Sequence, residues 1–295
     1  MMSFLTALIN GLSLGSIYAI IALGYTMVYG IAKMLNFAHG DFIMVGCYII
    51  FMFSSGLGLP PFLTVGIAVV LCTILGITTE RIAYRPLRGA ASPLAVLITA
   101  IGVSYFLENL ALLIFGADTK SFSSLISWSG ITLFGGSLQI QGITIVTILI
   151  SLFILFFLQL FIRKTREGQA MLAVSQDRGA AMLMGIDVNK TISLTFAIGS
   201  ALAAIAGALL ASAYPSLTPY TGAMPGIKAF VAAVLGGIGS IPGAMIGGMV
   251  LGIIEILSRT YISSQLSDAI VFGILVVVLI VRPTGILGKN IQEKV

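Results

Sequence analysis

Long runs of apolar residues, separated by short polar or turn-rich stretches, are the feature that most constrains this chain. Residues of the set AVILMFWYC make up 58% of its 295 residues, and charged residues make up only 8%. Because soluble domains carry about 25% charged residues, this chain has too little charge to cover a surface that faces water. In lipid the requirement reverses, since the outer surface is apolar and every backbone polar group must be paired inside a helix or a closed barrel.

The apolar runs predict helices rather than barrel strands, because the alternation of apolar and polar residues that marks a membrane strand does not run along this sequence. A spanning helix needs about 20 apolar residues. The candidates are 4–32, 37–53, 62–79, 93–115, 142–162, 191–213, 227–257 and 267–281. We expect an all-α fold, a polytopic transmembrane helical bundle with about eight or nine membrane segments, one of them broken.

Basic residues gather in two loops, which predicts that both loops are cytoplasmic. Loop 80–92 holds Arg81, Arg85 and Arg88; loop 163–190 holds Arg163, Lys164, Arg166, Arg178 and Lys190. Two candidate spans separate the loops, so they can share a side of the membrane. Three candidate spans precede the first loop, which places the N-terminus outside.

Segment 227–257 is 31 residues long and carries a glycine-rich interruption. If it crossed once, the tail with Arg282, Lys289 and Lys294 would lie outside, against the same rule. A hairpin of two shorter helices restores the tail to the cytoplasmic side. The residues expected at the break are Gly236, Gly237, Gly239, Ser240 and Gly243.

A second interruption, Asn36 to Asp41, lies near the start of the chain. A broken segment in each half of a transporter indicates a transport site built from discontinuous helices. The other interpretation is a short cytoplasmic loop, and the sequence does not decide between the two.

Polar side chains within or beside the apolar runs are candidates for the solute path, because such groups usually face the bundle interior or water. They can equally form structural hydrogen bonds to a neighbouring helix. The candidates are Asn36, His39, Asp41, Glu108 and Asn109.

Small residues recur every four positions, as in Gly243/Gly247, Gly248/Gly252 and Ala203/Gly207. Such ladders let helix backbones approach closely, so we interpret them mainly as packing surfaces.

Several classes of site have no support in the sequence. There is no G-x-x-x-x-G-K-[ST] nucleotide-binding motif. One histidine and two distant cysteines give no metal or catalytic arrangement, so we expect no catalytic residue, metal or cofactor. The net charge of +5 is explained by the two basic loops and implies no nucleic-acid partner.

Loop 163–190 can form helix, with apolar residues at Met171, Val174, Ala181 and Ile186. It is too polar to span and too apolar for a simple linker. A surface of this kind fits a cytoplasmic partner, or a helix that lies on the membrane surface.

Eight sequence blocks resemble the permease subunits of bacterial branched-chain amino acid ABC importers, of the shorter of the two permease types. The blocks are Gly11–Ala19, Leu23–Gly30, Asn36–Asp41, Glu80–Arg88, Ala180–Ile186, Gly226–Phe230 with Val234–Ser240, and Arg282–Gly285. Ala180, Ala181 and Gly185 match the general E-A-A-x-x-x-G loop motif, with Gly179 in place of the acid. Related permeases import urea or other amino acids, so the solute stays open, and a stand-alone secondary transporter is a further alternative.

The resemblance implies one transmembrane permease domain over residues 1–295, located in the bacterial inner membrane. It implies a heterodimer with a second permease, two cytoplasmic ATP-binding subunits and an extracytoplasmic solute-binding protein. It also implies that loop 163–190 couples the permease to the ATPases, through a surface that includes Asp177, Arg178, Ala180, Ala181, Met184 and Gly185.

Overall fold

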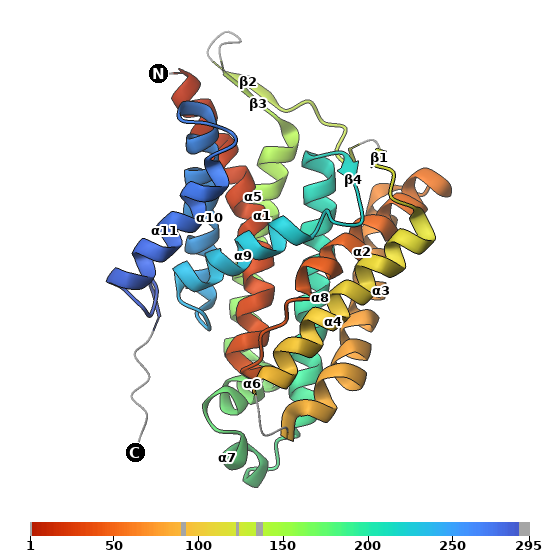
Figure 1. The fold of residues 1–295 in the computed structure, drawn as a ribbon, viewed down its shortest axis with the longest axis vertical. Helices are drawn as coiled ribbons and strands as arrows, with labels where there is room; N and C mark the ends of the chain where they lie inside the picture. Colours follow the sequence, from red (N-terminus) through yellow and green to blue (C-terminus); the bar gives the residue numbers. More distant parts are fainter. Residues whose placement is uncertain (1, 90–92, 122–123, 134–137, 289–295) are drawn as a thin grey trace. The chain divides into compact units, whose positions relative to one another are not determined.

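The computed structural model describes residues 2–89, 93–121, 124–133 and 138–288, and in these residues the chain is mostly helical (Figure 1). Seven of the described helices are long and apolar enough to cross a membrane. They are α1 (Met2–Ala32), α2 with its π-helical extension η1 (His39–Phe51, Met52–Gly56), α3 with η2 and η3 (Pro61–Thr79, Glu80–Tyr84, Arg85–Gly89), α4 (Pro93–Phe115), α5 (Gly142–Lys164), α8 (Val188–Ala213) and α10 (Ile241–Tyr261). The expected polytopic helical bundle is confirmed.

The remaining described elements are short. Two apolar helices are shorter than a full span, α9 (Ala223–Gly236) and α11 (Ser267–Val281). The second basic loop forms α6 (Arg166–Gln176) and α7 (Arg178–Leu183). Two antiparallel strand pairs join β1 (Lys120–Ser121) to β4 (Ser216–Leu217) and β2 (Ile131–Leu133) to β3 (Leu138–Ile140).

The chain divides into two compact units. Unit 1 comprises the residues up to Thr26, Trp128–Leu155 and the residues from Lys228 onward. Unit 2 comprises Met27–Ser127 and Phe156–Ile227.

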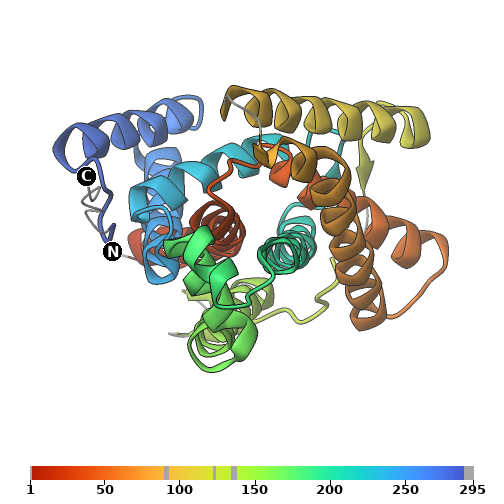
Figure 2. The same ribbon diagram turned by 90° about the horizontal axis from the view of Figure 1, so that it is seen from below.

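The core of unit 2 is the packing of α2 and α3 against α8, which Figures 1 and 2 both show side by side. Small residues bring these helices into close contact. A Cβ atom on Gly207 would lie 2.8 Å from the Ile43 carbonyl oxygen, and one on Gly46 would lie 3.1 Å from the Ala204 Cα. The ladder on α8 therefore packs directly against α2, as a small-residue ladder in a membrane helix predicts.

In unit 1 the two ladders of α10 pack in two directions. Gly248 and Gly252 lie against α1, where a Cβ atom on Gly15 would be 2.7 Å from the Met249 Cα. Gly243 and Gly247 lie against α9 instead. Each ladder therefore serves one neighbouring helix.

Segment 227–257 is broken where the sequence predicts. The break separates α9 from α10, and both Gly237 (φ +102°) and Gly239 (φ +94°) adopt backbone angles that favour glycine. Gly236 lies opposite Gly243, and Ala232 lies opposite Gly247. The two helices therefore run antiparallel, which confirms the hairpin.

Candidate functional site: the basic end of unit 2

Residues 163–190, here called the coupling segment, form two short helices because three side chains cap helix starts. The Thr165 hydroxyl accepts a hydrogen bond from the Gly168 N–H at 3.0 Å, which begins α6. Asp177 caps α7 and Asp187 caps α8, each at 3.0 Å. Side-chain oxygens at this position satisfy N–H groups that have no partner inside the helix. Figures 1 and 2 show α6 and α7 in green at one end of the long helices.

The apolar face predicted for this segment points inward. Met171, Val174 and Ala181 are buried, and α6 and α7 both pack against α8. Gly185 (φ +79°) ends α7: its N–H donates to the Met182 carbonyl, and the Ile186 N–H donates to the Ala181 carbonyl. This pair of bonds is a Schellman motif, in which glycine is the favoured residue.

A second apolar group faces outward. Met182, Leu183 and Met184, here called the apolar tip, are 60%, 91% and 82% exposed. Ala181 is buried against the protein, so its side chain does not lie on the exposed surface where we expected it. Ala180, Met184 and Gly185 are exposed, as that expectation requires. The helical period predicted which apolar residues of the segment face inward. It did not predict that the apolar tip would be exposed.

Asp177 and Arg178 have local roles in the structure. The Asp177 carboxylate caps α7, and the Arg178 guanidinium donates a hydrogen bond to the Ala32 carbonyl at the end of α1. A shallow, mostly apolar groove lies beside Met184 and includes two basic residues in its lining. Its lining residues are Lys164, Thr165, Arg166, Gln169, Ala170, Ala173, Met184 and Ile186.

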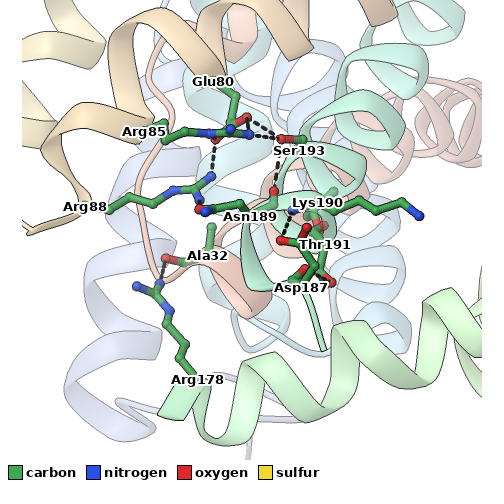
Figure 3. Close-up of polar contacts among 11 residues, drawn as sticks. Ala32, Glu80, Arg85, Arg88, Arg178, Asp187, Asn189, Lys190, Thr191 and Ser193 are labelled. Carbon is green, nitrogen blue, oxygen red and sulfur yellow. Dashed lines mark hydrogen bonds and ion pairs between the residues drawn. The ribbon is translucent and has the colours of Figure 1, made fainter. Parts of the chain in front are cut away.

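Five residues at the end of α3 and the start of α8 form a polar group, here called the arginine cluster (Figure 3): Glu80, Arg85, Arg88, Asn189 and Ser193. Glu80 is fully buried. Its carboxylate accepts from Arg85 Nη2 at 3.2 Å, from Arg88 and from the Ser193 hydroxyl at 2.5 Å. Two guanidinium groups therefore compensate one buried carboxylate, as a buried charge requires.

The same cluster reaches α8 through two further bonds. Arg88 Nη1 donates to Asn189 Oδ1, and Arg85 Nη2 donates to Ser193 Oγ, both at 2.7 Å. The two basic loops thus meet at one end of unit 2, which agrees with the expectation that they share a side of the membrane.

The predicted path residues of unit 2 lie in different environments. Asn36 is buried and accepts a 2.8 Å hydrogen bond from the Tyr84 hydroxyl. The Asp41 carboxyl interacts with the Ser104 side chain and lies near Glu108. His39 is also buried, with its ring edge-on to Phe42. Asn109 is exposed, with its amide bonded to the Tyr105 carbonyl. The structure therefore brings only some of these path candidates together: Asp41 lies near Glu108, whereas Asn109 is exposed.

Residues 33–38 link α1 to α2, and the start of α2 packs against the residues that precede α9. A Cβ atom on Gly40 would lie 2.7 Å from the Gly222 carbonyl oxygen. The first chain interruption thus meets the turn-rich stretch before the hairpin, a juxtaposition that spacing along the chain could not predict.

In unit 1, the break between α9 and α10 is closed by the chain that follows α11. The Ile286 and Leu287 N–H groups donate to the Leu235 and Gly236 carbonyls at 2.9 and 3.0 Å. At the α10 start, the Ser240 hydroxyl accepts from the Gly243 N–H at 3.2 Å. The helix ends at the break therefore have backbone partners within the protein.

Unit 1 holds a second charged group, whose pairings the sequence analysis did not predict. Lys228 Nζ lies 2.7 Å from both Glu255 and Asp268, and Glu255 also pairs with Arg259 and accepts from the Tyr18 hydroxyl at 2.9 Å. We call these five residues the lysine cluster. The available signal was Lys228 itself, because a lysine inside an apolar run needs a counter-charge.

The described residues contain no group of three or more His, Cys, Asp or Glu side chains placed to hold a metal ion. The basic end of unit 2 presents an exposed apolar tip on the capped coupling segment. Hydrogen bonds connect this segment to the end of α1, the end of α3 and the start of α8.

Comparisons with known proteins point to one family. Residues 7–279 match the model described as the permease component of branched-chain amino acid transport systems. The high-affinity branched-chain amino acid transport system permease protein LivH of Salmonella typhimurium is 45% identical, over 99% of this chain and 98% of the relative. The corresponding permease protein BraD of Pseudomonas aeruginosa is 44% identical over the same shares.

One solved structure supports the fold alone. PsaBC from Streptococcus pneumoniae, solved in complex with a Fab, aligns with a TM-score of 0.51 and 16% identity, over 95% of this chain and 91% of that chain. The family match covers nearly the whole chain, and the long apolar helices agree with a multi-pass membrane protein. The chain is therefore a member of the branched-chain amino acid transport system permease family.

Proposed function

We propose that this chain is a transmembrane permease subunit of an ATP-driven importer for branched-chain amino acids in the bacterial inner membrane. Support for the solute comes from relatives that are 45% and 44% identical over nearly their whole length and are named for this transport. Residues 1–295 would act as one permease domain, forming the path with a second permease. An external solute-binding protein would deliver the solute, and two ATP-binding subunits would hydrolyse ATP.

The observation that carries the coupling proposal is the apolar tip. Three consecutive large apolar side chains stand exposed on a segment between two spans, α5 and α8. Exposed apolar patches of this kind mark interaction sites. The caps at Asp177 and Asp187 and the Schellman motif at Gly185 fix the shape of the segment, so a partner that displaces the tip would displace the start of α8.

The basic end of unit 2 would be cytoplasmic, and the N-terminus would lie outside. The Arg178 bond to Ala32 supports this orientation, because it puts the end of α1 at the basic end, and α1 is long enough to cross the membrane. Polar residues Asn36, His39, Asp41, Glu108 and Asn109 stay candidates for the path.

The solute is tested by reconstituting the complex and measuring uptake of leucine, isoleucine, valine, urea and polar amino acids. We expect ATP-dependent uptake of the branched-chain amino acids. ATP-independent uptake by this chain alone, driven by an ion gradient, would show that it is a secondary transporter instead.

The coupling surface is tested with Leu183→Asp and Met184→Asp, because a charge on the apolar tip disrupts docking without changing the buried face. Leu172→Asp, on the exposed side of α6, is the matched control. We expect only the tip variants to lose ATPase co-purification. Normal assembly and uptake in both tip variants would make this segment a helix on the membrane surface. Tryptophan at Ala181 or Gly185 is less informative, since one residue is buried and the other has positive φ.

A further inference from the structure

The arginine cluster joins the end of α3 to the start of α8, and we infer that it is the joint through which movement of the coupling segment reaches the transmembrane helices. Glu80 is the positioning residue at its centre. The inference rests on the proposed coupling of the apolar tip to an ATPase, and it adds the route by which that movement is passed on.

The first step of the route is the connection from α7 to α8. Only three residues, 184–186, separate the end of α7 from the Asp187 cap. The Gly185 Schellman motif holds two of those residues by backbone hydrogen bonds. A displacement of the tip is therefore delivered to the first turns of α8 rather than absorbed in a flexible linker.

The second step is the pair of bonds from α8 to the end of α3. Asn189 and Ser193 lie four residues apart, and neighbours at this spacing share one face of a helix. Arg88 holds Asn189, while Arg85 and Glu80 hold Ser193. Figure 3 shows Glu80 and both arginines pointing from η2 and η3 toward these two residues. The η2 turn is π-helical, a departure from α-helix that is frequent at functional sites.

The third step is the packing beyond the cluster. α3 and α8 are in close contact along their length and both pack on α2, with small residues at the contacts. Close-packed helices transmit strain to one another. A push on the cluster therefore moves α2, α3 and α8 together, and the Arg178 bond to Ala32 carries the end of α1 with them.

The bonds to α8 are separable from the charge balance. Glu80 retains both guanidinium partners if Asn189 and Ser193 are removed, so the buried carboxylate stays compensated. Asn189 is exposed, and its replacement opens no cavity. The Arg88–Asn189 bond is therefore not needed to keep the protein stable. It is needed if the cluster passes movement from α8 to α3.

The test uses the complete transporter complex in proteoliposomes, with Asn189→Ala and the double variant Asn189→Ala/Ser193→Ala. Lys190→Ala is the matched control, because Figure 3 shows the Lys190 side chain extending away from the cluster. The measurements are leucine uptake, ATPase activity with and without the solute-binding protein, complex yield and melting temperature. Leu183→Asp is assayed in parallel to report on the proposed docking.

We expect the double variant to assemble and hydrolyse ATP while uptake per ATP falls by roughly three- to thirtyfold, the range that coupling residues show. Asn189→Ala should give part of that loss, and Lys190→Ala none. Unchanged uptake per ATP in the double variant overturns the inference, and so does a loss of uptake that only follows a loss of complex. If Leu183→Asp transports normally, the proposed docking itself has failed, which is a different result.

Discussion

Glu80 in unit 2 and Glu255 in unit 1 are both fully buried carboxylates that pair with two basic side chains, yet their surroundings differ. In the arginine cluster the two guanidinium groups exceed the single carboxylate by one positive charge. In the lysine cluster Asp268 adds a second carboxylate, so the charges balance. The more buried basic partner is 11% exposed in the arginine cluster (Arg88) and 4% exposed in the lysine cluster (Lys228), and the other partner is exposed to nearly the same degree in both.

The difference indicates that similar buried ion pairs have different roles in the two units. The lysine cluster connects α9, α10 and α11 and receives Tyr18 from α1, all within unit 1. Because α9 is too short to span, a charged anchor at Lys228 holds it in place beside α10. The arginine cluster instead extends through Asn189 and Ser193 to the helix that follows the coupling segment. The comparison suggests an anchor in unit 1 and a joint in unit 2.

The largest effect should come from Glu255→Ala. This change leaves Lys228 buried with only the partly exposed Asp268 as counter-charge. Breaking a buried ion pair by removing one partner costs about 3–5 kcal/mol, so we expect little folded protein. Fluorescence-detected size exclusion and thermal melting in detergent measure it.

Glu255→Gln is the control for shape, because it keeps the size of the side chain and part of its hydrogen bonding. It should recover some folded protein but less than wild type. A Glu255→Ala protein that melts at the wild-type temperature would contradict the anchor and remove the contrast between the clusters.

Glu80→Ala also removes one partner of a buried ion pair, and we expect it to destabilise the protein by about 3 kcal/mol, the lower end of the same range. Arg85 can turn toward water, and Arg88 keeps its bond to Asn189. We expect most of the protein to fold but uptake to fall further than folded yield does. Melting temperature and leucine uptake, measured on one preparation, separate the two effects. Equal losses of folded protein and of uptake at Glu80 and Glu255 would erase the distinction between anchor and joint.

Much of the fold follows from local sequence. Apolar run length predicted the long helices, and the basic residues of the tail, together with the glycine-rich interruption of segment 227–257, predicted a hairpin there. Small-residue spacing predicted the close contacts at Gly207 and Gly248. These features depend on residues that are near each other in the chain, where period and turn chemistry are informative.

The pairings within the site could not be predicted in the same way. Ser193 meets Glu80 across 113 positions, and Tyr18 meets Glu255 across 237. Such contacts depend on which helices become neighbours, and the period of a helix gives only the direction of a face. For the same reason Ala181 was expected on the exposed surface, although it packs inward.

The smallest effect should come from Asp268→Asn, which gives the lysine cluster the same charge count as the arginine cluster. Asp268 is 43% exposed, and ion pairs with an exposed partner contribute about 0.2–1 kcal/mol. Lys228 keeps Glu255 at 2.7 Å, so its buried ammonium stays compensated. We expect a melting temperature close to wild type and unchanged uptake per ATP. If Asp268→Asn instead uncoupled uptake from ATP hydrolysis, the lysine cluster would also pass on movement, and the assignment of anchor to unit 1 and joint to unit 2 would fail. If it destabilised the protein as much as Glu255→Ala, charge balance rather than burial would be what separates the two clusters.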